Sequence, residues 1–503
     1  MKKFFLFFVV TTSMILQAYA GGLVSNTNQS ASYYRMLARG ATTEGDAVYY
    51  NPAGLAFMEQ GFTLSLNTQM IWMQRTINND LGTLNLHQGK AGNNSEFVGN
   101  LYVPFFPGIY AAYKTGQWTF SLGFNPPAGG GSIEFADGLP MLELPVSVLP
   151  GTVSALQIPT ANYSMSSMMK GSSICYGVQA GASYRITDVI GAFAGVRMLF
   201  ASNSYEGYLR EIKINPQLPG DLGAIVSGQM VDAAGLTAQG NQIDGIATTL
   251  EPLLPGGDPH ILSQYYQLKT LAGGLKAIAA GIPGNTVLDV SQKGNGIAPI
   301  LGVHINLVRF HFAAKYEFKT NITIKNETAS NAMNMYPDGL ELRSDVPALL
   351  SLAGSMDIVP SLKLSVGYIH HFEKQAKIES WVAIPTVDNP AAGAIMNRAD
   401  LIDGGTNEIL AGLEFNLNER LTFSTGCQYS MVNVSDLWQN DITHNLTNFT
   451  FGLGAAFNIN ERITLNIGGL NTWYTTSTVE ITNYTQKYDR TNKAIALGID
   501  FRF

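Results

Sequence analysis

In segments of this 503-residue chain where apolar and polar residues alternate, several charged side chains share the polar positions. His311, Lys315, Glu317 and Lys319 share one parity, and Arg197 lies between apolar neighbours in another such segment. Since alternate residues of a strand point to opposite faces, we expect these charges on one polar face. Arg197, Lys315 or His311 could hold a ligand carboxylate through a charge-assisted hydrogen bond. The same charges could instead form a structural ion-pair network, and both readings stay open.

The strands that would carry this face alternate apolar and polar residues with period two. Residues 62–72, 118–124 and 362–368 show the alternation clearly, each with one apolar face and one polar or small face. Every second connection is a tight turn, as at 114–117 and 416–420, and the connections between them are long. About fourteen segments fit this template, near residues 60–75, 103–115, 116–126, 172–186, 188–204, 297–308, 309–325, 345–357, 359–376, 405–417, 419–433, 445–458, 460–478 and 492–503.

This alternation of short and long connections is typical of a membrane β-barrel with short periplasmic turns and long outer loops. The composition agrees, because only 13% of the residues are charged. No segment approaches the roughly 18 consecutive apolar residues of a membrane helix. We therefore predict an all-β fold, a transmembrane antiparallel β-barrel of about 14 strands over residues 59–503. A soluble β-sandwich is the alternative, although it would not need connection lengths that alternate.

The two ends of the chain fit export to a bacterial outer membrane. Two lysines, a short apolar run and the sequence Ala18-Tyr-Ala20 predict a secretory signal peptide over residues 1–20. The mature chain would then begin at Gly21. At the other end, the last strand stops on Phe503, which would close a barrel edge. This ending also resembles the C-terminal signal that the outer-membrane assembly machinery reads.

Several functional classes are not favoured. The net charge of −7 comes without a basic patch, so we expect no nucleic-acid partner. By strand parity Cys175 faces the lumen and Cys427 faces lipid, so both cysteines should be free. The histidines are scattered without metal-ligand spacing, and we expect neither a metal nor another cofactor. No G-x-S-x-G motif occurs, and we expect no enzymatic activity.

The longest predicted loop, about residues 205–296, contains a helical pattern. The glycine pair at 273 and 274 should weaken that helix. It would cap the barrel or offer an apolar face to a ligand. The apolar residues recur at spacings of three and four and are Ile261, Tyr265, Leu268, Leu271, Leu275, Ile278 and Ile282.

Residues 21–58 differ from the strands that follow. Asn51 can cap a short helix, Pro52 suits its first position, and residues 53–58 would continue it. Such a segment cannot join the barrel wall, so we predict that it folds back and plugs the lumen. Its apolar side chains would line a pocket or merely pack against the wall; these are Tyr49, Tyr50, Leu55 and Phe57.

With the plug motif Asn51-Pro52-Ala53 ahead of fourteen strands, the chain resembles the FadL/TodX family of outer-membrane transporters for long-chain fatty acids and other hydrophobic compounds. The resemblance implies helices in the loops after the fifth and seventh strands, here 205–296 and 326–344. Those helices would form an outer hydrophobic groove, with Leu268, Leu271, Leu275 and Ile278 on it. Glu317 departs from the family, which often has Arg at this place, so ligand contacts do not transfer residue by residue.

The resemblance further implies passive uptake by a monomer that contacts outer-membrane lipid. The ligand would land on the groove, enter an apolar pocket, and leave sideways into the membrane when the plug rearranges. A long-chain fatty acid or an aromatic hydrocarbon would fit such a route. An open porin is one alternative, although it would not need a plug. A surface adhesin is another, because the outer loops are long.

Overall fold

The computed structural model describes residue 23, residues 25–90, 92–217, 228–282, 284–331, 334–384, 389 and 392–503. The predicted signal peptide and Gly21 lie outside the described residues. The strands are β1 (Gly61–Asn79), β2 (Glu96–Thr115), β3 (Trp118–Phe135), β4 (Thr160–Arg185), β5 (Ile190–Pro216), β6 (Thr286–Asn306), β7 (Phe310–Glu317), β8 (Thr323–Asn331), β9 (Glu341–Arg343), β10 (Leu349–Val359), β11 (Leu362–His371), β12 (Glu379–Ala383), β13 (Gly393–Asn397), β14 (Asn407–Asn416), β15 (Leu421–Met431), β16 (Asn448–Asn460), β17 (Ile463–Tyr474), β18 (Ser477–Ile481) and β19 (Tyr484–Arg502).

The helices are short, apart from one pair between β5 and β6. The α-helices are α1 (Ala31–Arg35), α2 (Ala47–Tyr50), α3 (Pro140–Ser147), α4 (Leu149–Ser154), α5 (Ala233–Leu250) and α6 (Pro259–Gly281). The 3₁₀-helices are η2 (Pro52–Phe57), η3 (Gly82–Leu86), η5 (Glu251–Gly256), η6 (Glu373–Gln375), η7 (Arg398–Leu401) and η8 (Asp436–Trp438). Within the described part of the chain, no helix is long and apolar enough to cross a membrane.

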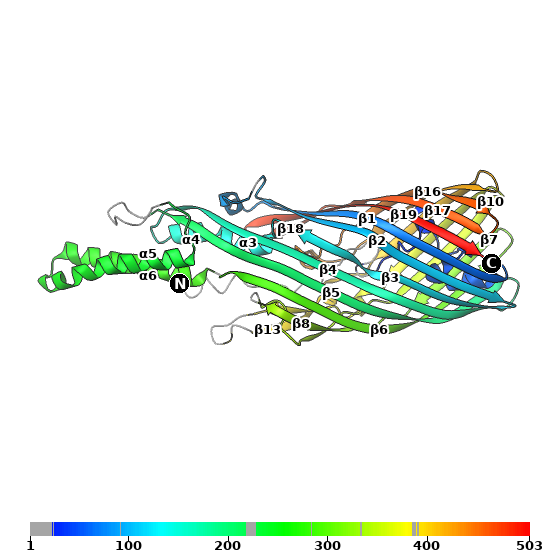
Figure 1. Ribbon diagram of the computed structural model, residues 1–503, viewed down its shortest axis with the longest axis horizontal. Helices are drawn as coiled ribbons and strands as arrows, with labels where there is room; N and C mark the ends of the chain where they lie inside the picture. Colours follow the sequence, from blue (N-terminus) through cyan, green and yellow to red (C-terminus); the bar gives the residue numbers. More distant parts are fainter. Residues whose placement is uncertain are drawn as a thin grey trace.

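The strands form one long antiparallel barrel, as predicted (Figure 1). Among the described residues fourteen wall strands close the barrel, with β8 continuing the wall beyond β7 and β18 beyond β17. The predicted closure is also confirmed. β19 pairs with β1, and Phe503 exchanges two backbone hydrogen bonds with Phe62, at 3.0 and 2.8 Å.

Alternation along the wall strands separates an outward apolar face from an inward polar one. On β3, Phe120 and Leu122 are 53% and 54% exposed, whereas Thr119 and Ser121 between them are buried. Such an outward face is suited to the hydrocarbon of a membrane. Cys175 is buried, Cys427 is half-buried, and both are free, as the sequence predicted.

Two predictions about the outer loops were wrong. The outer ends of β4, β5 and β6 extend as paired strands well into the predicted loops 127–171 and 205–296. Residues 164–173 carry small polar side chains on both faces, so their alternation is weak. The loop 326–344 was expected to carry a helix, but β8 and β9 pair there and residues 334–340 are not helical.

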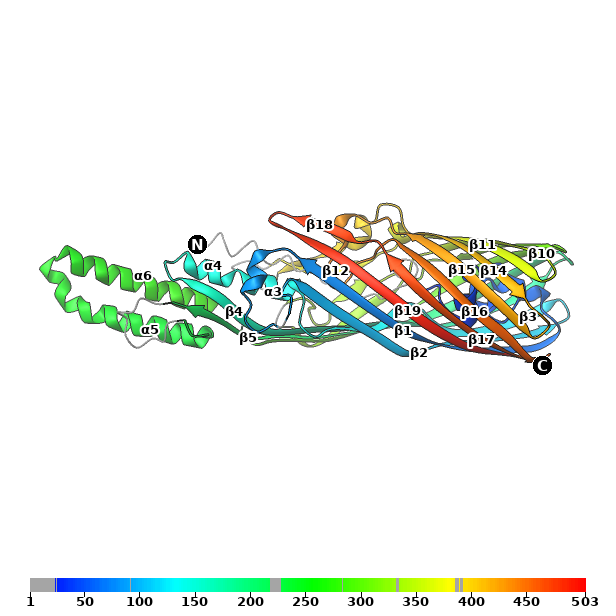
Figure 2. The same cartoon turned by 90° about the horizontal axis from the view of Figure 1, so that it is seen from above.

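The longest helices and the plug helices lie at opposite ends of the molecule. α5 and α6 extend from the end of the barrel opposite the C-terminus, and the view from above shows the two helices as an antiparallel hairpin (Figures 1 and 2). α1, α2 and η2 lie inside the lumen, where nearly all their side chains are buried. The segment 25–58 therefore fills the barrel near its C-terminal end, as predicted for the plug.

Candidate functional site

The plug is held to the wall through its own backbone. α2 and η2 are too short to satisfy all of their carbonyl groups internally. Side chains of the barrel wall donate to these carbonyls instead, from four different strands. The pairs are Gln179 to Val48 at 2.5 Å, Lys315 to Tyr49 at 2.9 Å, Ser183 to Pro52 at 2.6 Å, Thr119 to Leu55 at 3.0 Å, and Lys114 to Ala56.

The Asn51-Pro52-Ala53 motif joins α2 to η2 in the plug. Asn51 caps η2, because its Oδ1 accepts from the backbone N–H of Ala53 at 3.2 Å, and Pro52 takes the first helical position. The Asn51 side chain also donates through Nδ2 to the backbone carbonyl of Val303 on β6, at 3.1 Å. A Cβ at Gly302 would lie only 2.6 Å from Asn51 Oδ1, so this close approach depends on glycine.

The predicted cations Arg197 and Lys315 come together under the plug. Arg197 pairs with Glu317 and donates to Gln179. Lys315 lies 3.8 Å from Glu317 and donates to the carbonyl of Tyr49. Both cations also face the Tyr49 ring, at 4.9 and 5.0 Å from its centroid. These contacts form an ion-pair network that includes the plug. A structural ion-pair network was the second of the two readings that the sequence left open.

The other predicted pocket residues are dispersed. Tyr50 stacks on Tyr33 with ring centroids 5.6 Å apart, and its hydroxyl donates to Thr27 at 2.9 Å. Leu55 is fully buried, and Phe57 packs against His304 at 5.5 Å. His311 lies on the other side of His304, with their ring centroids 5.9 Å apart, and lines a small cavity of about 40 Å³ beside Glu44 and Lys363.

Sequence reasoning missed two plug arginines. Arg35 pairs with Glu414 of β14 and donates to Ser424 at 2.6 Å. Arg39 holds Asp46 and Glu44 within the plug, at 2.7 and 2.6 Å. Arginine and carboxylate residues close together in residues 35–46 were a visible signal, because buried charges need partners.

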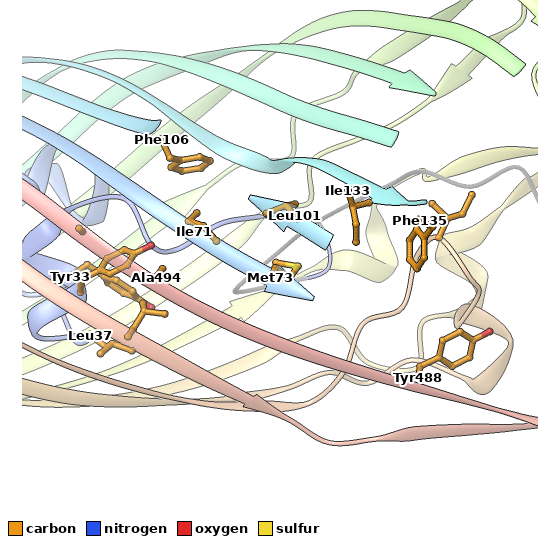
Figure 3. Packing of buried hydrophobic residues seen from close by; sticks show 14 of the residues in the cluster. Tyr33, Leu37, Ile71, Met73, Leu101, Phe106, Ile133, Phe135, Tyr488 and Ala494 are labelled. Atoms are coloured by element: carbon orange, nitrogen blue, oxygen red, sulfur yellow. The ribbon is translucent and has the colours of Figure 1, made fainter. Parts of the chain in front are cut away.

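A buried apolar cluster extends from the plug to the outer mouth. Figure 3 shows Tyr33 and Leu37 of the plug at one end and Phe135 and Tyr488 at the other, with Ile71, Met73, Leu101 and Ile133 between them. The cluster also includes Leu139, Leu142 and Leu144 at α3 and Ile442 of the β15–β16 loop. Buried apolar side chains therefore form a continuous cluster from the plug to the outer mouth within an otherwise polar lumen.

The wall beside this cluster is interrupted. β2 pairs with β3 at Leu101–Ile133 and again at Ile109–Phe124. Residues 102–108 and 125–132 between these points are not paired with each other, and we call this stretch the β2–β3 break. Prolines at positions 104, 107, 126 and 127 remove backbone donors there. Leu101 and Phe106 carry the apolar cluster to its edge.

An apolar hollow lies beside the break on the outer surface, and an extended segment of the plug lies on its inner side. The outer hollow, about 820 Å³, is lined by outward residues of β1, β16, β17 and β19 together with Phe105 and Pro107 of the break. On the inner side lies the segment Ser25–Gln29, which we call the strap. Asn26 donates its backbone N–H to Pro127 at 2.7 Å, and Asn125 donates to Gln29 at 2.8 Å.

The predicted groove helix exists as α6, but its apolar face is covered. Leu268, Leu275 and Ile278 are buried against α5, α4 and the outer ends of β4 and β5, and Leu271 packs beside them. Lys269 and Lys276 both pair with Asp244 of α5, at 2.8 and 3.0 Å. α5 itself was not predicted, because its apolar residues are sparse and glycines interrupt it.

These features define a class: a closed fourteen-strand barrel with a plug at its N-terminal end. Solved channels share this fold. A FadL homologue of Pseudomonas aeruginosa superposes with a TM-score of 0.62 at 12% identity, over 96% of this chain and 100% of that one. The toluene transporter TodX of P. putida superposes with a TM-score of 0.53 at 15% identity, over 92% and 95%. No protein-family model and no curated protein matches the sequence.

Proposed function

We propose that this protein is an outer-membrane channel that lets hydrophobic small molecules, above all long-chain fatty acids, cross passively. The observation that carries the proposal is the apolar cluster that leads from the outer mouth to the β2–β3 break. An apolar chain gains roughly 0.8 kcal/mol for each buried CH₂ group. The apolar side chains of this cluster would therefore favour such a molecule over water and ions where it contacts them.

The proposed route ends sideways. The strap covers the break from inside, and the apolar hollow adjoins the β2 side of the break on the outer surface. When the strap withdraws, a molecule at Leu101 and Phe106 meets hydrocarbon instead of the periplasm. Lateral release avoids the polar lower plug, where Arg35, Arg39 and their carboxylates fill the lumen.

For a fatty acid, we propose Lys315 and Arg197 as the carboxylate partners. Lys315 donates to Tyr49 only while α2 is in place, so movement of the plug would free one of its donors. A ligand carboxylate would then compete with Glu317 for both cations. The structural network and the ligand site are thus two states of the same residues.

The test is native mass spectrometry of the purified protein with oleate, oleyl alcohol and toluene. We expect the wild-type protein to form saturable adducts with all three compounds. In Lys315→Ala only the oleate adduct should weaken, because only oleate carries a carboxylate. Equal loss of all three would show a damaged fold, and no adduct of any would contradict the transport proposal. Removal of residues 21–58 addresses the porin alternative, because a plugged channel should become leaky whereas an open porin should not.

A further inference from the structure

The strap is bound on two nearly opposite sides of the barrel. Ser25 forms a backbone bridge to Ala128 of β3, beside the break. Its side chain Oγ lies 3.1 Å from Nδ1 of His371, the last residue of β11. In the closed sheet, β3 and β11 are separated by five other wall strands in one direction and by seven in the other. The strap thus connects the interrupted wall to an intact wall across the lumen.

On the intact side, two sets of polar contacts hold the strap and Leu23 before it. Nε2 of His371 lies 3.1 Å from Oε1 of Glu408 on β14. The backbone N–H of Leu23, just before the strap, donates to Glu373 of η6. Glu373 is itself fixed, because both the N–H and the hydroxyl of Thr406 donate to its other oxygen at 2.8 Å. His371, Glu373 and Glu408 have no exposed surface.

An apolar contact completes this attachment. The Leu23 side chain is fully buried in a cluster formed by the outer loops. Its neighbours come from the β11–β14 and β15–β16 connections, and they are Ala376, Ile378, Ala399, Ile402 and Trp438. One end of the segment is therefore packed into the outer loops, while the other lies over the break.

We propose that His371 and Glu373, with Leu23 in its apolar socket, form a latch that keeps the strap over the β2–β3 break. A hydrophobic molecule that enters the socket would compete with Leu23 and so loosen the strap from a distance. This regulatory role rests on the proposed function in one respect, because it takes the β2–β3 break as the exit for the ligand. The attachment of the strap is a separate claim.

A catalytic reading of Ser25, His371 and Glu408 is the rival. A serine, a histidine and a carboxylate in a hydrogen-bonded row can activate a nucleophile. Here the serine belongs to a segment without free surface: Ser25 is 7% exposed and the strap residues on its C-terminal side are equally covered. Among the described residues, this row contains the only contact between the strap and a histidine. That position fits a role in attaching the strap to the wall.

Hydrogen–deuterium exchange of the mature full-length protein tests the latch without any transport assay. The variants are Glu373→Gln, which disrupts the acceptor for Leu23, and Ser25→Ala, which leaves the wall unchanged and guards against misfolding. The matched control is Glu143→Gln, an equally buried carboxylate that binds His87 and Tyr163 in a separate loop network.

We expect exchange in the peptide covering residues 25–29 to rise about tenfold in both latch variants, since each loses buried hydrogen bonds, and to stay unchanged in the control. Unchanged exchange in both latch variants would overturn the latch. Labelling of Ser25 by a fluorophosphonate in the wild-type protein would overturn it too, in favour of a nucleophile. Faster exchange without faster oleate uptake would leave the latch standing and count against the break as the exit.

Discussion

At the level of single residues, Arg197 and Lys315 are buried in the lumen together with a carboxylate that both contact. Glu317 is the carboxylate shared by Arg197 and Lys315. Glu317→Gln would leave two buried cations without it, and breaking a buried ion pair costs about 3–5 kcal/mol. We expect that loss in the free energy of unfolding in denaturant, together with tighter oleate binding because the competing carboxylate is gone. An unchanged unfolding midpoint would contradict the pairing described here.

Asp441 in the β15–β16 loop gives a pH-dependent prediction. It accepts hydrogen bonds from the Met141 backbone at 2.6 Å and from Gln486, yet burial raises its pKa to about 6. The folded state therefore keeps a proton that the unfolded state releases from about pH 4 upward, and the wild-type protein loses stability between pH 4 and pH 6.

Asp441→Asn cannot ionise, so its stability relative to wild type should rise across this window, by up to about 3 kcal/mol. Denaturant unfolding at pH 4 and pH 7 measures the difference. A constant difference between the two proteins at both pH values would mean that Asp441 does not titrate there.

Some of these residues could be placed from sequence and some could not. Strand parity alone put Arg197, Lys315 and Glu317 in the lumen, and all three are buried there. Their partners could not be predicted, because Tyr49 and Gln179 are brought to them by the closure of the barrel over the plug. The latch residue His371 gave no signal, since its partner Ser25 lies 346 positions away.

At the level of elements, glycines in the wall make room for α1. A Cβ at Gly468 of β17 would lie 2.6 Å from the backbone nitrogen of Arg35. Gly468→Leu should therefore displace α1 and make the barrel leaky, which single-channel conductance in planar bilayers would detect. The adjacent Gly469 faces outward with no atom nearer than 3.8 Å, so Gly469→Leu is the matched control. Equal, low conductance of the two variants would contradict this packing.

The elements were predictable where local pattern decides them. Period-two alternation located all fourteen wall strands, and the capping residues Asn51 and Pro52 located η2. Alternation failed at residues 164–173, where serine and methionine occur on both faces, and α5 was missed because its stability comes from packing on α6. The β2–β3 break was also missed: its prolines were visible, but which neighbouring strand they leave unpaired depends on the sheet.

At the level of the whole molecule, the buried apolar cluster, the interrupted wall and the strap lie along one proposed route. The central claim is that hydrophobic molecules leave through the β2–β3 break. A Cβ at Gly131 of β3 would lie 4.0 Å from the Cβ of Val103 on β2, within the range of about 3.5–4.5 Å that a disulfide requires. Gly131 has a φ of 108°, so folding of the variant needs a check by heat-dependent electrophoretic mobility.

The most direct measurement is uptake of radiolabelled oleate and toluene by cells carrying Val103→Cys with Gly131→Cys, in a background with Cys175→Ser and Cys427→Ser. If the break is the exit, the oxidised protein should block uptake of both compounds, and a reductant should restore it to the level of the cysteine-free background. Uptake by the oxidised protein at the rate of the reduced protein would contradict the lateral route.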